Sequence, residues 1–324
     1  MPRPSRRQML AGLAASGGLL AGCVNRSESA TDSPTDTDND TAVTFPEDTT
    51  ADACPSVPGA DQTVCYEAVD PDTVPLALVP GSQSLEPDQS TTFTLRNQSE
   101  QALQTNFYDW QIYKRVDGDW YYILPDSTPM PLNRLEPGGT HTWTVTVSLD
   151  DMTDGGSVDR VEGNDTVTVT ALGGGHYAFV TRGSVPTGAA GTANISFVAG
   201  FDLEAPSLEL TRTDAIDDTE WDGGTLIAQS TRGSPLDSDD KRDAYILERI
   251  DATDTTPEEV IIEQVVRNEQ LRDAIALSQA FDADTVRLEE YSRSDPAFGL
   301  GDATPTYEFR GQGYRVRGIE GGGA

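Results

Sequence analysis

The chain has 324 residues, of which 54 are acidic and 22 are basic, so its formal net charge at pH 7 is −32. Proteins that bind DNA or RNA need a basic surface to replace the counterions of the phosphates. Beyond the first 22 residues, no basic cluster is longer than Lys114-Arg115 or Lys241-Arg242. The composition therefore excludes nucleic acid as a partner.

The first 22 residues combine an arginine pair with a short apolar stretch. The segment SRRQML at residues 5–10 carries Arg6 and Arg7, and LLAGC at residues 19–23 ends the stretch. It is shorter than the roughly 20 apolar residues that cross a membrane. These features resemble the leader of a lipoprotein exported by the twin-arginine route, with Arg6 and Arg7 as its signal. The resemblance implies cleavage before Cys23, lipid on its sulfur, and an extracytoplasmic protein anchored to the outer face of the cell membrane.

Two short segments separate the leader from the main body. Residues 23–53 are mostly Ser, Thr, Asp and Pro. They cannot bury enough apolar surface to offset the entropy of ordering, so they predict a disordered acidic linker. Residues 54–73 form a lead-in with Cys54 and Cys65, which in an exported protein predict a disulfide. A metal site is the less favoured alternative, because no His lies nearby and the spacing is not Cys-x-x-Cys. We expect no metal and no cofactor.

Residues 74–205 contain a succession of short strand patterns. Apolar and polar side chains alternate at 91–96 and 140–149, and Asp117-Gly118 predicts a tight hairpin. The further strands that we expect are 106–116, 118–124, 167–169, 176–180 and 193–203. Such a series of short strands with turns between them predicts a mainly β fold and a β-sandwich.

Four motifs give this region a family resemblance. They are Leu-x-Asn-x-Ser at residues 95–99, Val-Asp-Gly-Asp-Trp at 116–120, Leu-x-Pro-Gly at 135–138 and Gly-His-Tyr-Ala at 175–178. Together they resemble the immunoglobulin-like modules of prokaryotic surface lipoproteins. The resemblance implies an immunoglobulin-like sandwich and supplies no catalytic residues. The inter-sheet disulfide of that family is absent.

The aromatic side chains of the predicted sandwich can be interpreted in two ways. Alternation along 106–116 places Tyr108, Trp110 and Ile112 on one face and Phe107 and Tyr113 on the other. Core packing is the commoner use of such rings. The alternative is a ligand platform for sugars, for which Tyr113 and Tyr121 are the candidates.

Residues 206–324 predict a small α+β domain with one long helix. Strands are expected at residues 226–230, 244–250, 286–291, 306–310 and 314–317. Between them, Thr256 as the N-cap, Pro257 and Glu259 predict a helix that runs to about Phe281 and breaks near Asn268. In this helix Glu263 and Arg267 are spaced to pair on the outer face.

Motifs of known catalytic chemistry are missing from the chain. There is no Gly-x-Ser-x-Gly, His-Glu-x-x-His or phosphate loop, and both histidines, His141 and His176, lie inside strand patterns. The sequence predicts a non-catalytic surface lipoprotein that serves binding or envelope architecture, with an envelope protein or glycan as partner. A carbohydrate-active hydrolase, a glycan-binding protein and a solute-binding protein are the alternatives.

Sequons for N-linked glycosylation occur along the chain. The candidate acceptors are Asn25, Asn39, Asn97, Asn164 and Asn194.

The excess of acids resembles the acid-rich, lysine-poor composition of haloarchaeal proteins. Lys114 and Lys241 are the only lysines, and the acids are spread over the whole chain. Self-repulsion strains such a chain in dilute buffer, whereas at 1 M salt the screening length falls to about 3 Å. We therefore expect the protein to unfold on dialysis to low salt. Thermal unfolding followed at several salt concentrations checks this, and a midpoint independent of salt would contradict it.

Overall fold

The computed structural model describes residues 42–46, 49, 54–125, 128–148, 160–162, 165–187, 191–233, 242–251, 256–291 and 304–319. Arg6, Arg7 and Cys23, together with the candidate acceptors Asn25, Asn39 and Asn164, lie outside these residues. Among the helices that are described, none has the length and apolar character that a membrane span requires.

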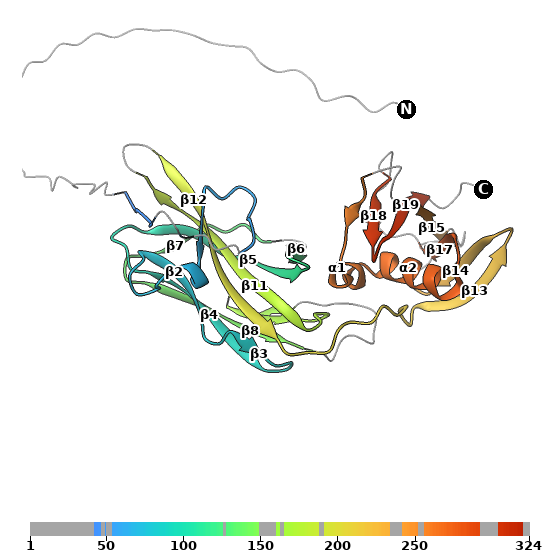
Figure 1. Ribbon diagram of the computed structural model, residues 1–324, viewed down its shortest axis with the longest axis horizontal. Helices are drawn as coiled ribbons and strands as arrows, with labels where there is room; N and C mark the ends of the chain where they lie inside the picture. The colour runs from blue at the N-terminus through green and yellow to red at the C-terminus, as the bar shows by residue number, and fades with distance from the viewer. Residues whose placement is uncertain are drawn as a thin grey trace, which may run out of the picture. The chain divides into compact units, whose positions relative to one another are not determined.

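The described chain is mainly β, as the sequence predicts, and its strands form three sheets (Figure 1). The first sheet has the order β1 (Gln62–Cys65), β12 (Thr192–Leu203), β11 (Gly175–Pro186), β5 (Leu103–Val116), β6 (Asp119–Leu124), with β3 (Ser84–Leu85) on β12 and β7 (Asn133–Leu135) on β5. The second has the order β2 (Leu76–Pro80), β4 (Ser90–Asn97), β8 (Thr140–Val147), β10 (Thr166–Val169), β9 (Arg160–Glu162). A 3₁₀ turn, η1 (Tyr66–Ala68), follows β1.

These two sheets share one hydrophobic core. From Thr91 in β4 and from Trp143 in β8, every second side chain is buried, which is the burial that the alternating sequence predicts. The rings of Phe93 on β4 and Phe179 on β11 stack with centroids 4.4 Å apart, and Trp143 on β8 lies 5.6 Å from Phe179. Aromatic contacts of this kind join the inner faces of the two sheets.

The predicted hairpin between β5 and β6 is confirmed. Val116 pairs with Asp119, so the loop contains only Asp117 and Gly118, which have φ of 52° and 102°. A two-residue loop with both φ angles positive matches the twist of the flanking strands, and glycine adopts that conformation without a steric penalty.

The third sheet belongs to the C-terminal part of the chain. Its order is β13 (Ile216–Asp222), β14 (Thr225–Ser230), β17 (Thr285–Tyr291), β15 (Arg242–Ile250), β19 (Gln312–Ile319), β18 (Thr306–Phe309), β16 (Glu258–Glu259). The helix α2 (Glu269–Phe281) lies against this sheet (Figure 1). Leu271 and Ile275 of α2 share a core with Leu247 and Val286 of the sheet.

The prediction of one long helix from Pro257 is wrong. Glu258 and Glu259 form β16, which pairs with β18, and the first helix, α1 (Ile262–Arg267), begins only afterwards. The predicted break at Asn268 is confirmed, because the Asn268 side chain accepts the Leu271 N–H and caps α2. Pairing with β18 therefore outweighs the local start signal at residues 256–259.

Candidate functional site

The long strand β5 contains a wide bulge, which sets the geometry of the main candidate site. Trp110 pairs with Thr181 of β11 and Thr105 pairs with Gly183, so residues 106–109 lie opposite the single residue Arg182. A bulge of this kind redirects side chains, and bulges are common beside functional sites. It also corrects the predicted alternation, because Phe107 packs on the inner core instead of sharing a face with Tyr113.

The polar groups of the bulge backbone are bonded to side chains. The Phe107 N–H donates to Asn133 Oδ1 at 3.2 Å, and the Tyr108 N–H donates to Asn106 Oδ1 at 2.9 Å. The Phe107 carbonyl accepts the indole N–H of Trp143 at 2.8 Å. Because these bonds replace those of a regular strand pair, the bulge is a specified part of the fold.

An ion pair lies at this bulge. Arg182 donates from Nε to Asp109 Oδ2 at 3.0 Å and from Nη2 to Asp109 Oδ1 at 2.9 Å. The hydrogen bonds to Asp109 raise the pKa of the Arg182 guanidinium. Arg182 is also bonded through its backbone, because the Thr105 hydroxyl donates to the Arg182 carbonyl at 2.6 Å. A bidentate pair fixes both side chains in one orientation.

A cavity of about 490 Å³ lies beside this ion pair. Gln104, Ser184 and Asn194 line it together with the pair, while Gly59-Ala60 and residues 128 and 130–132 line it from two loops. Met130 and Leu132, in the second loop, are 91% and 75% exposed. The volume lies within the range of small-molecule sites, and side chains with free polar groups and exposed apolar side chains meet there.

The disulfide closes the loop that contributes Gly59 and Ala60. Cys54 and Cys65 are bonded, which confirms the predicted pairing. Between them Val57 packs on Val180 and Val198, on the outer face of the first sheet. The Asp61 N–H donates to the Asn194 carbonyl at 2.8 Å and the Asn194 N–H donates to Asp61 Oδ2 at 2.8 Å. The lead-in is therefore attached to β12 at the edge of the cavity.

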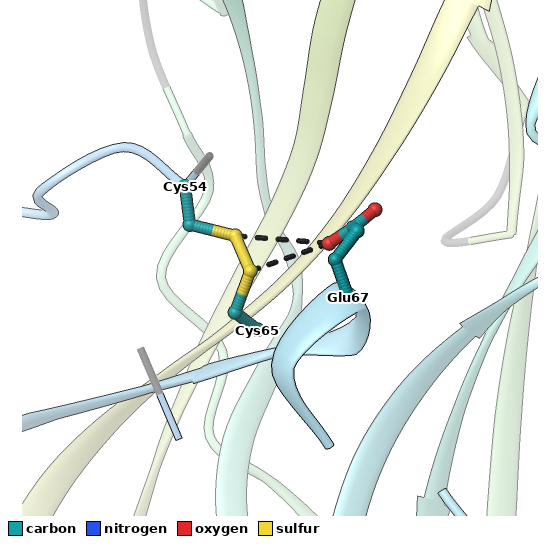
Figure 2. Close-up of side chains that lie close together, drawn as sticks. All are labelled: Cys54, Cys65 and Glu67. Atoms are coloured by element: carbon teal, nitrogen blue, oxygen red, sulfur yellow. Dashed lines mark hydrogen bonds between the residues drawn. A yellow bond between two sulfur atoms is a disulfide. The ribbon is translucent and has the colours of Figure 1, made fainter. Parts of the chain in front are cut away.

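Figure 2 shows a carboxylate beside this disulfide. Glu67 Oε2 lies 3.2 Å from Cys65 Sγ and 3.8 Å from Cys54 Sγ. Its other oxygen accepts the Gly200 N–H at 2.8 Å. The three side chains are close enough to hold an ion, but sulfurs bonded to each other do not offer the thiolates that a metal requires. We therefore assign these three side chains a structural role.

Neither tyrosine of the predicted sugar platform lines the cavity. Tyr113 is only 7% exposed and packs with Val57 and Val180 on the outer face of the first sheet, so its ring face is not available for stacking. Tyr121 is half-buried. Burial, followed by a hydrogen bond with Glu259, raises the pKa of Tyr121 to about 12.

The described glycosylation candidates differ in exposure. Asn97 is 1% exposed, and its amide donates to the Gln101 and Leu135 carbonyls at 2.8 Å each. Asn194 is exposed, and its side chain makes no hydrogen bond within the described residues. Of these two, Asn194 has the accessible acceptor.

The two histidines lie apart from the cavity lining. The His141 ring stacks on Phe107 with centroids 3.7 Å apart. His176 Nδ1 lies 2.8 Å from Asp202 Oδ1 on the neighbouring strand, in a partly exposed pair.

Asp109 and Arg182 are the site residues that sequence reasoning missed. A regular strand would place both at ordinary alternating positions, and only the register between β5 and β11 brings them together. Gly183, next to Arg182, is the nearest signal in the sequence. A Cβ there would lie 2.7 Å from Leu103 Cδ1 and 2.9 Å from the Gln104 carbonyl oxygen, so the close approach of the strands requires glycine.

Neither a protein-family model nor a curated protein sequence matches the chain.

Proposed function

We propose that this protein is a non-catalytic binding protein of the cell surface, and that the cavity beside the β5 bulge holds its ligand. The observation that carries the proposal is the bidentate pair between Asp109 and Arg182, which a bonded bulge fixes at a cavity of small-molecule size. A rigid polar centre next to exposed apolar side chains is the usual composition of a ligand site.

The proposal includes the cellular location and the fold that the sequence predicts. The leader supports a lipid-anchored protein on the outer face of the membrane of a halophile, and two sheets with a shared core support the immunoglobulin-like sandwich at residues 74–205. The C-terminal residues 206–324 then form the accompanying α+β domain.

The anchor has a direct test. Substituting Cys23→Ser removes the sulfur that the lipid requires, so we expect the protein to appear in the medium or to remain as unprocessed precursor. Fractionation of cells followed by immunoblotting measures this. Cys54→Ser, which leaves Cys23 in place, is the control and should stay in the membrane fraction. Unchanged membrane retention of the Cys23→Ser variant, with normal processing, would contradict the lipid anchor.

The binding function is tested by filling the cavity. Envelope material from the producing cells is separated into glycan, peptide and lipid fractions. Each fraction is added to the purified full-length protein at native salt, which is the salt concentration in which the producing cells grow. A ligand that binds the folded state raises the thermal midpoint. We expect one fraction to raise it for the natural protein and not for Ser184→Trp, whose indole occupies the cavity.

The matched control is Thr142→Trp, which places the same ring on an exposed position of β8. This variant should respond as the natural protein does. If no fraction stabilises the natural protein, or if Ser184→Trp responds equally, the cavity is not the ligand site.

A further inference from the structure

Three polar side chains form a row across the first sheet at the floor of the cavity. Ser184 on β11 pairs directly with Gln104 on β5 and with Asn194 on β12. Neighbouring strands lie about 4.8 Å apart, so the row offers an amide, a hydroxyl and an amide at regular intervals. Within the described residues none of the three side chains makes a hydrogen bond. Their donors and acceptors are therefore available to a ligand.

The lining of the cavity has no net charge, although the protein as a whole is strongly acidic. Among the described lining residues only Asp109 and Arg182 are charged, and they neutralise each other. The chain as a whole has a net charge of −32. A cationic ligand would bind more strongly to the many acidic side chains elsewhere on the chain than to this neutral lining. An anionic ligand would have to displace Asp109 before it could pair with Arg182. The lining therefore favours a neutral ligand.

The strands beneath the row leave no free backbone edge. Gln104 pairs with Arg134 on one side and with Ser184 on the other. Asn194 pairs with Ser184 and bonds Asp61 through its backbone. An extended peptide that binds by adding a strand needs an open edge, so recognition here must use side chains.

We propose that the cavity binds a neutral saccharide, a proposal that rests on the binding function stated above. Its hydroxyl groups bond the row of Gln104, Ser184 and Asn194, and successive rings cross the strands. Met130 and Leu132, the exposed apolar side chains of the second loop, contact its C–H faces. Amide and hydroxyl side chains suit the hydroxyl groups of such a ligand. A hydroxyl donates and accepts through the same oxygen, whereas an amide donates through its NH₂ group and accepts through its carbonyl oxygen.

The test uses the side-chain amide signals of the full-length protein in nuclear magnetic resonance at native salt. The variants Gln104→Ala and Asn194→Ala identify the signals of these two amides. The probes are maltotriose, cellotriose and mannotriose as neutral saccharides, and trialanine as a neutral peptide. We expect at least one trisaccharide to shift both signals. The double variant should bind it roughly tenfold more weakly, as expected for the loss of two hydrogen bonds.

Gln89→Ala, which removes an exposed amide outside the cavity, should leave the affinity unchanged. If trialanine shifts the two signals and the trisaccharides do not, the cavity is a ligand site but the saccharide assignment is wrong. If none of the probes shifts them, the saccharide assignment fails, and the thermal-midpoint experiment with envelope fractions decides separately whether the cavity binds anything.

Discussion

Replacing Glu263 with alanine should lower the free energy of unfolding by about 3–5 kcal/mol, because it leaves the buried ammonium of Lys114 without its partner. Glu263 on α1 is 1% exposed and Lys114 on β5 is 8% exposed. The ammonium donates to Glu263 Oε1 and also to the Gly174 carbonyl at 3.0 Å. Denaturant titration at native salt measures the loss.

Lys114 and Glu263 each make further contacts with the residues around them. The ammonium lies 5.1 Å from the centre of the Tyr177 ring, and the Gly173 N–H donates to Glu263 Oε1 at 3.3 Å. Burial, together with Glu263, raises the pKa of Tyr177, so its hydroxyl stays protonated and donates to the Gly173 carbonyl. Removing one carboxylate therefore disturbs several hydrogen bonds at once.

Two further variants separate the lost ion pair from other effects. Glu209→Ala removes an exposed carboxylate and should change the free energy of unfolding by less than about 0.5 kcal/mol. The double variant Lys114→Met with Glu263→Leu removes both charges and should recover most of the loss. A Glu263→Ala protein as stable as the Glu209→Ala control would show that this carboxylate is not buried with Lys114.

Glu263 also shows where the sequence stops being informative. Its spacing from Arg267 predicts an exposed helical pair, and nothing in the sequence near it indicates burial. The partner is Lys114, 149 residues away, and Arg267 instead donates to the Thr170 carbonyl at 2.9 Å. Local spacing can predict a helical face, but it cannot say which face another part of the chain covers.

Where the determinants are local, the predictions hold. The disulfide follows from two cysteines in a chain whose leader predicts export, the β5–β6 hairpin follows from Asp117-Gly118, and the break between the helices follows from Asn268. The candidate site depends instead on a register shift between β5 and β11. Such a shift moves each side chain to another face, so Asp109 and Arg182 could not be paired from the sequence.

Replacing Arg232 with methionine should be as costly as losing Glu263, or more costly, because two buried carboxylates then lose the same cation. Asp273 and Glu290 have no exposed surface, and the Arg232 side chain is 6% exposed. Arg232 donates to Asp273 Oδ2 at 2.7 Å and to Glu290 Oε2 at 2.9 Å. Although burial alone would lower the pKa of Arg232, these two carboxylates raise it.

We therefore expect Arg232→Met to lower the free energy of unfolding by at least about 3–5 kcal/mol, or to prevent the C-terminal sheet from folding. Denaturant titration measures the first result and amide hydrogen exchange in β14 and β17 measures the second. Arg134→Met, at an arginine whose side chain is 60% exposed, is the control and should cost less than about 0.5 kcal/mol. Adding Asp273→Asn and Glu290→Gln to Arg232→Met removes the two carboxylates that Arg232 bonds, so this triple variant should recover part of the loss. If it is no more stable than Arg232→Met alone, the cost arises from packing rather than from the two carboxylates that have lost Arg232.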